Sequence, residues 1–168
     1  MQSKTLVTTA TAVVALFAAA CGSSSPSTAA ASPSPSAAAA SPSPSAPATA
    51  ATIKVATDPK LGKILVDGKG MTVYLFVADK STSSTCYTSC AQFWPPVLTS
   101  GAPTAGDGAQ ASLLGTTART DGTTEVTYAG HPLYYFLNDK KPGDTSGQGV
   151  NGFGGLWWVL TPTGAAMH

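Results

Sequence analysis

Two stretches of this sequence, sixty residues apart, are near copies of each other. Residues 70–80 align with residues 130–140 and share their glycine, tyrosine, phenylalanine, aspartate and lysine positions. Each copy follows a Leu-Gly and then an Asp-Gly dipeptide, and each precedes a tryptophan segment. A repeated unit of this kind buries its apolar face against its neighbour. We therefore expect two repeats, at about residues 61–97 and 114–162, to form one domain.

The repeats have the composition of strands and tight turns. Short runs of Val, Thr, Tyr and Phe alternate with glycine-containing segments, which predicts a mainly β fold with little helix. We expect two sequence-related antiparallel β units packed as one small sandwich or barrel-like domain. Asp67-Gly68 and Asp121-Gly122 are predicted to form type I′ hairpin turns, because these residues tolerate positive φ. The expected strands are Ile53–Ala56, Ile64–Val66, Thr72–Val77, Thr116–Arg119, Glu125–Tyr128, Pro132–Leu137 and Trp157–Leu160.

The N-terminal part of the chain has a different composition. A short positive start precedes an apolar segment that ends in small residues directly before Cys21, which predicts a secretory signal peptide over residues 1–20. A cysteine at this point resembles a bacterial lipobox, so we expect a lipid on Cys21; the alternative is an ordinary signal peptide with an incidental thiol. Residues 22–51 contain no charge and no aromatic ring, which predicts a disordered tether before the domain of residues 52–168.

Charge and hydropathy argue against two classes of protein. Once Lys4 is removed with the signal peptide, eight basic residues balance eight acidic ones, so the protein lacks the basic surface that nucleic acid binding needs. The long apolar segment at the N-terminus is shorter than the roughly 18 residues of a membrane-spanning helix. We therefore expect an extracytoplasmic protein that the lipid on Cys21 anchors to the bacterial cell membrane.

Several motifs together resemble a known family. The paired Tyr-x-Phe-x-x-Asp motifs occur with Cys86-x-x-x-Cys90 before Trp94-Pro95-Pro96, and with a late Trp157-Trp158. This combination resembles the bacterial lipoproteins with a Y-x-(F/W/Y)-x-x-D motif, also called the secreted repeat of unknown function, over about residues 61–162. The resemblance implies a secreted lipoprotein and assigns no activity.

The aromatic residues of the two motifs are candidates for either the core or a ligand site. In a strand, Tyr74 and Phe76 share one face and the other face is apolar too, which predicts an interior strand covered on both sides. The same pattern holds for Tyr134 and Phe136. We interpret these rings as core residues whose tyrosine hydroxyls are hydrogen-bonded, and a ligand contact is the alternative.

The motif aspartates, Asp79 and Asp139, come where each strand is expected to end. Our first interpretation is that each carboxylate caps a turn by accepting backbone N–H groups. The alternative is that repeat symmetry brings the two acids together as an acid–base or cation site.

Cys86 and Cys90 remain as a pair once Cys21 is lipidated. Outside the cytoplasm a structural disulfide that closes this short loop is the expected state. A redox-active pair would need a nearby cation to lower a thiol pKa, and no Lys, Arg or His lies within five residues of either cysteine.

Met71 and His131 occupy equivalent positions in the repeats. Met and His together are a ligand pair for haem iron or copper, so a pseudo-twofold arrangement of the repeats would let both approach one metal. The alternative is that each residue begins a strand at a turn and that the two are unrelated.

These observations favour a protein without catalytic activity, because no motif for hydrolytic, phosphate-binding or paired-metal chemistry is present in the sequence. The leading hypothesis is a binding or structural module of the cell envelope that contacts an envelope protein or a small ligand and needs no cofactor. The alternative is an extracytoplasmic redox accessory protein that holds haem or copper.

Overall fold

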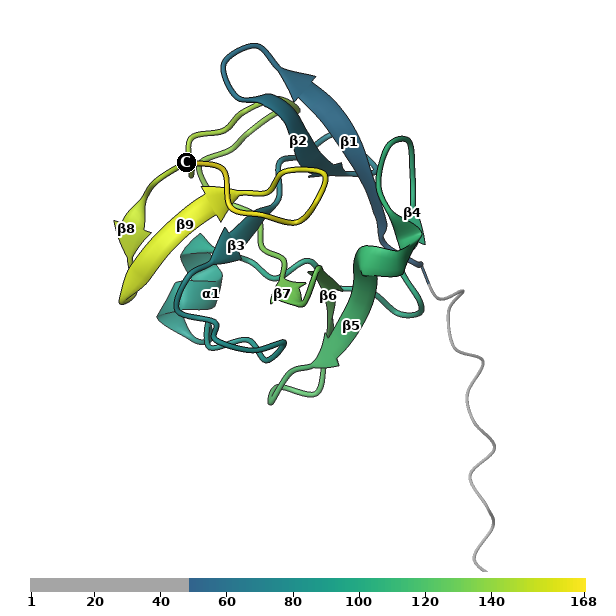
Figure 1. The fold of residues 1–168 in the computed structure, drawn as a ribbon. Helices are drawn as coiled ribbons and strands as arrows, with labels where there is room; N and C mark the ends of the chain where they lie inside the picture. Colours follow the sequence, from purple (N-terminus) through teal and green to yellow (C-terminus); the bar gives the residue numbers. More distant parts are fainter. Residues whose placement is uncertain (1–48) are drawn as a thin grey trace, which may run out of the picture. The chain divides into compact units, whose positions relative to one another are not determined.

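Strands account for most of the secondary structure of this protein. The structure is a computed structural model that describes residues 49–168, so the predicted signal peptide, Cys21 and nearly all of the tether lie outside the described residues. The strands of this part of the chain form three small sheets, and one short α-helix accompanies them; Figure 1 shows how these elements are arranged. The predicted mainly β class is thus confirmed, in a sandwich-like form without a closed barrel among residues 49–168. No helix in that range is long and apolar enough to cross a membrane.

The sheets have three strands each, in the orders β2-β1-β4, β3-β9-β8 and β5-β6-β7. All pairings are antiparallel except the short parallel pair of β1 and β4. The elements are β1 (Thr52–Asp58), β2 (Gly62–Asp67), β3 (Tyr74–Phe76), α1 (Ser89–Phe93), β4 (Thr104–Ala105), the 3-10 helix η1 (Ala111–Leu113), β5 (Leu114–Ala118), β6 (Thr124–Tyr128), β7 (His131–Pro132), β8 (Asn151–Gly152) and β9 (Gly155–Val159).

Each repeat is a three-stranded meander. β1 and β2 form a hairpin, and the chain then returns along β2, where the Val73 N–H donates to the carbonyl of Leu65. β5 and β6 form the matching hairpin, and the Leu133 N–H donates to the carbonyl of Val126. The first repeat therefore includes β1 and starts earlier than residue 61.

The Leu-Gly dipeptides are not equivalent in the two repeats. Leu61 lies in the turn between β1 and β2, whereas Leu114 begins β5. The sequence alignment of these flanking dipeptides was wrong because a two-residue match carries no information about which side of a hairpin it lies on.

A pseudo-twofold axis passes between the two central tyrosines. The Tyr74 N–H donates to the carbonyl of Tyr134 at 2.8 Å, and the Tyr134 N–H donates to the carbonyl of Tyr74 at 3.0 Å. This reciprocal pair joins the two repeats in an antiparallel bridge. The repeats therefore pack on each other through the motif itself.

The hairpin turns at Asp67-Gly68 and Asp121-Gly122 are present, but the predicted turn type was wrong. In both, a glycine N–H donates to a carbonyl three residues earlier, and that glycine has positive φ: 89° at Gly70 and 83° at Gly122. These are three-residue loops, in which only the last position needs the left-handed conformation.

Type I′ turns occur at two other places. Ala129-Gly130 joins β6 to β7, and Phe153-Gly154 joins β8 to β9, and both residues of each pair have positive φ. Two-residue hairpin loops require this geometry, so the loop length selects it even at alanine and phenylalanine.

The first aromatic strand divides the core into two clusters, as its two apolar faces predicted. Tyr74 and Phe76 lie in one cluster with Trp94 and Trp157, while Leu75 lies in the other cluster. In the second repeat this holds only for the first part of the expected strand, because β7 ends at Pro132 and Leu137 is 46% exposed. Pro132 removes a donor at this point, and Tyr134 is held by isolated bridges instead.

Candidate functional site

Four aromatic rings form a stack that crosses the pseudo-twofold axis, which passes between the two indoles. Phe76 stacks on Trp157, Trp157 on Trp94 and Trp94 on Phe136, with ring centroids 4.0, 4.0 and 4.3 Å apart. The central indoles are inclined by only 3°, and both are buried. The stack is symmetric, since Phe76 of the first repeat corresponds to Phe136 of the second and Trp94 corresponds to Trp157. The tryptophan segments that follow each motif therefore supply the centre of the interface between the repeats.

The two tyrosine hydroxyls bond across the repeats. The Tyr74 hydroxyl donates to Asp139 Oδ2 at 2.5 Å, and the Tyr134 hydroxyl donates to Asp79 Oδ2 at 2.6 Å. Each tyrosine therefore uses the aspartate of the other repeat, and both rings pack edge-on against a central tryptophan. This confirms the interpretation of the tyrosines as core residues with hydrogen-bonded hydroxyls.

The second oxygen of each aspartate caps a turn, as predicted. Asp79 Oδ1 accepts the Thr85 N–H at 2.8 Å, and Asp139 Oδ1 accepts the Ser146 N–H at 2.9 Å. Each carboxylate thus fixes the loop that follows its own strand and the tyrosine of the opposite repeat. These contacts do not join the acids to each other, and a shared acid–base or cation site stays a prediction.

Burial keeps both phenols protonated. Desolvation raises the pKa of Tyr74 and of Tyr134 far above the ordinary value, and the carboxylate beside each hydroxyl raises it further. At neutral pH each hydroxyl is a neutral donor rather than a base. Each phenol can therefore join the repeats as a hydrogen-bond donor at neutral pH.

One of the two pairs has a buried charge cluster beside it. Arg119 Nη1 lies 2.6 Å from Glu125 Oε2 and also donates to the Ser84 hydroxyl, which is 2.7 Å from the hydroxyl of Tyr134. Glu125 Oε1 has no hydrogen-bond partner within the described part of the chain. Burial raises the pKa of Glu125 to about 7. The Arg119 charge lowers this pKa and the Asp79 charge raises it, but burial has the largest effect.

Sequence reasoning missed this charge cluster. Arg119 and Glu125 are the single arginine and the single glutamate of the whole sequence, and they flank the Asp121-Gly122 turn. That uniqueness was the available signal. Hairpin register, which the sequence did not fix, decides whether two such side chains meet.

The predicted disulfide between Cys86 and Cys90 is present. Both residues are buried, and the Cys86 carbonyl accepts Arg119 Nη2 at 2.9 Å. The disulfide spans the start of α1, a helix that the sequence did not predict. It therefore fixes the loop that carries Ser84 and Thr85 against the charge cluster.

The two proposed metal ligands do not meet at the axis. Met71 and His131 each come three residues before a central tyrosine, and the tyrosines pair in an antiparallel direction. Residues at these positions lie at opposite ends of such a pair, about 20 Å apart for straight strands. Among residues 49–168 no group of three or more His, Cys, Asp or Glu side chains is arranged to hold a metal ion. Haem or copper binding stays a prediction.

Five exposed apolar residues lie on segments that contact one another, and we call these five residues the apolar patch. The Val77 N–H donates to the Leu156 carbonyl, the Leu137 N–H donates to the Phe93 carbonyl, and the rings of Phe93 and Phe153 lie 5.8 Å apart. These five residues are 37–48% exposed and are five of the six large exposed apolar residues within 49–168. The sequence did not identify the patch, because its members come from four separate segments.

Comparison with known proteins gives one match. A family model described as a secreted repeat of unknown function matches this chain twice, over residues 55–98 and 115–161. The two matches together cover more than half of the chain, and each contains one meander, one motif and one tryptophan segment. No curated protein and no solved structure matches the chain.

Proposed function

This chain belongs to the family of secreted repeats of unknown function, and from that membership we propose that it works outside the cytoplasm as a non-catalytic binding module. Its partner is a protein of the cell envelope, and the contact is made through the apolar patch. The observation that carries this proposal is that five large exposed apolar side chains lie on segments that contact one another.

The interior of the domain supports a binding role rather than a catalytic one. The motif tyrosines and aspartates are buried and bonded to one another, so they have no free face for a substrate. The central tryptophans are likewise buried in the stack. The aromatic contact surface that remains is formed by Phe93 and Phe153.

Charge at the edge of the patch indicates the chemistry of the partner. The Lys80 ammonium group donates to the Val77 carbonyl, and the Lys140 ammonium group donates to the Leu137 carbonyl. Two exposed cations therefore border the apolar surface at equivalent positions in the repeats. The partner surface has an apolar centre with acidic groups at its rim.

The position of the patch is compatible with a tethered domain. Figure 1 shows α1 and the β8–β9 hairpin on the side of the domain away from the start of β1. We propose that Cys21 carries the lipid and that the segment up to residue 51 is the tether. Mass spectrometry of the N-terminal peptide tests the lipid, and Cys21→Ala should release the protein into the medium.

The binding proposal is tested by comparing surface variants in the producing bacterium. Phe93→Ser combined with Phe153→Ser should abolish recovery of one defined envelope protein after cross-linking. Leu98→Ser is the matched control, because Leu98 is 47% exposed and lies outside the patch. Equal recovery with the patch variant and the wild type would refute the proposal. Self-association that the patch variant abolishes would also refute it, because the occupant would then be a second copy.

A further inference from the structure

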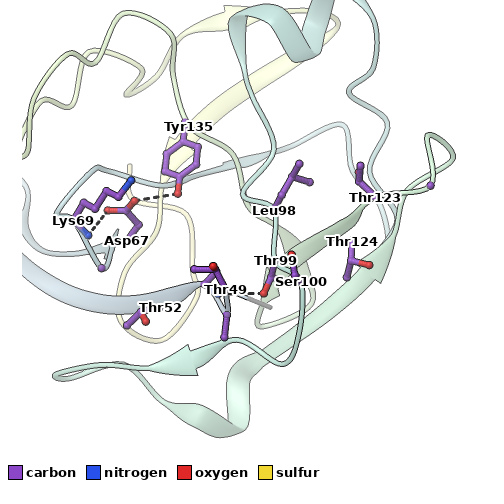
Figure 2. A pocket seen from close by; sticks show the side chains of 14 residues that line it. Thr49, Thr52, Asp67, Lys69, Leu98, Thr99, Ser100, Thr123, Thr124 and Tyr135 are labelled. Atoms are coloured by element: carbon purple, nitrogen blue, oxygen red, sulfur yellow. Dashed lines mark hydrogen bonds between the residues drawn. The ribbon is translucent and has the colours of Figure 1, made fainter. Parts of the chain in front are cut away.

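A second surface feature has different chemistry from the apolar patch. A cavity of about 680 Å³ lies between the Asp67–Lys69 turn, the segment around Thr99 and the turn at Gly122. Its size is within the range of small-molecule sites, about 300–1,000 Å³. Figure 2 shows Asp67 and Lys69 on one side of this cavity, with Thr99, Ser100 and Thr124 on the other.

Hydroxyl groups dominate the lining of the cavity. Of the fourteen lining residues, six are Ser or Thr and a seventh is Tyr135. Leu98 is the one lining residue with a large aliphatic side chain. A hydroxyl both donates and accepts hydrogen bonds, so this lining matches a ligand that itself carries many hydroxyls. It does not match an acyl chain or another apolar molecule.

Part of this polar lining is already used by the protein and is held rigid. The Tyr135 hydroxyl donates to Asp67 Oδ2 at 3.1 Å, while Asp67 Oδ1 accepts the backbone N–H groups of Lys69 and Met71. Burial and the Asp67 charge raise the pKa of Tyr135 above its ordinary value, so the hydroxyl remains a donor. The Asp67 carboxylate is thus oriented from three directions.

Other polar groups at the cavity are unoccupied. The Lys69 ammonium group and the hydroxyls of Ser100 and Thr124 have no hydrogen-bond partner within residues 49–168. They lie on the two sides of the cavity that Figure 2 separates, so one ligand would span them. Together they offer donors and acceptors on both sides and a single positive charge.

The repeats differ at this point, which separates the cavity from the shared core. Tyr135 corresponds to Leu75 in the first repeat, and Leu75 is buried in the core with only 3% exposure. Tyr135 is half-buried and lines the cavity. The tyrosine at this position therefore packs against the core and also lines the cavity.

We infer that this cavity binds a saccharide. Sugar hydroxyls would bond to Asp67, Lys69, Ser100 and Thr124, and the edge of Tyr135 would contact the ring. The site lies outside the apolar patch, and the inference does not depend on the proposed envelope protein.

The test is an NMR titration of the full chain with amide ¹⁵N detection. The probes are chitotetraose, cellotetraose and maltotetraose, with inorganic phosphate and octanoate as non-saccharide probes. At least one saccharide should shift the amide signals of Gly68, Ser100 and Thr123 in a saturable way. Lys69→Ala should weaken that binding about tenfold, because it removes a charged donor. Lys63→Ala, an exposed lysine outside the cavity, should leave it unchanged.

Three results would overturn the inference. The first is that none of the saccharides shifts these amide signals. The second is that phosphate or octanoate binds in the cavity and the saccharides do not. The third is that a saccharide shifts signals elsewhere and Lys69→Ala has no effect on its affinity. Lys69 and Lys63 are both exposed, so neither substitution should unfold the domain. A loss of saccharide affinity in Lys69→Ala alone would therefore not come from a folding defect.

Discussion

The two crossed tyrosine–aspartate pairs are nearly identical at their centres and differ in what surrounds them. The pair of Tyr134 and Asp79 has Ser84, a buried ion pair and a disulfide beside it. The pair of Tyr74 and Asp139 has backbone and a glycine instead, since the Gly147 N–H donates to the Tyr74 hydroxyl at 3.2 Å. The symmetric part of the molecule is thus the junction of the repeats, and the loops that hold each aspartate have diverged.

The same contrast appears on the hairpin strands. The matching hydrogen bonds of Val73 to Leu65 and of Leu133 to Val126 make Ile64 the counterpart of Glu125. Both side chains are fully buried. One repeat therefore has an aliphatic residue where the other has a charged one. The two repeats bury this position alike, but they differ in the polarity of the side chain.

The largest expected effect is on the charged side. At pH 7.5, Arg119→Met should lower the free energy of unfolding by about 4 kcal/mol, because it leaves Glu125 buried without its partner. Chemical denaturation measures this change. The double variant Arg119→Met with Glu125→Ile imitates the first repeat and should recover most of the loss. A double variant as unstable as the single one would show that the ion pair is not interchangeable with apolar packing.

The second prediction concerns pH on the same side. Burial raises the pKa of Glu125 from 4.5 to about 7, so its protonated form is favoured by folding. The resulting stabilisation is complete below pH 4.5 and is lost as pH rises through 7, with a total on the order of 3 kcal/mol. Thermal unfolding from pH 4.5 to pH 8 should show this decline, and Glu125→Gln should flatten it. An equal decline in Glu125→Gln would assign the effect to another group.

The third prediction concerns the side of the Tyr74 pair, which lacks the buried ion pair. A methyl group on Gly147 would lie 2.8 Å from the Tyr74 ring and 2.9 Å from Trp94. Because both rings are held by the stack, Gly147→Ala should cost about 2 kcal/mol by overpacking. Gly143→Ala is the control for a loop glycine with open space around it, although its positive φ makes a smaller cost expected there too. Equal effects in the two variants would mean that Gly147 is not confined by the rings.

The last prediction removes one hydroxyl on each side, and the smallest effect is expected at Tyr134. Tyr74→Phe should cost about 2 kcal/mol, since it leaves a buried oxygen of Asp139 and the Gly147 N–H unpaired. Tyr134→Phe should cost about 1 kcal/mol, because Ser84 keeps its bond to Arg119. Denaturant unfolding of both variants gives the comparison. The reverse order would mean that the charged surroundings make the Tyr134 pair the stronger one.

Local patterns in the sequence predicted the parts of the structure that depend on few residues. Alternation around Tyr74 gave the buried strand, and the spacing of Cys86 and Cys90 in an exported protein gave the disulfide. The turn-capping role of Asp79 followed from its place at the strand end. The strand and the turn cap need only neighbours within a few positions along the chain, and the disulfide needs the expected export of the protein in addition.

Pairing between distant segments could not be predicted in the same way. The repeat alone leaves open whether Tyr74 bonds to the aspartate of its own repeat or of the other one, because both arrangements have the same symmetry. The contact of Arg119 with Ser84 depends on how the second hairpin packs on the loop after the first motif. The apolar patch likewise arises from tertiary packing alone.

The exchange of partners between the repeats has a consequence for the order of folding. The two tyrosine–aspartate hydrogen bonds join residues that are 65 and 55 positions apart in the sequence. Neither repeat can therefore form these bonds by itself. Contacts of such long sequence separation slow folding, because chain closure must precede any gain from them. A chain that leaves the cell N-terminus first would therefore hold its first repeat open until Asp139 has emerged, and would become resistant to proteases in a single late step.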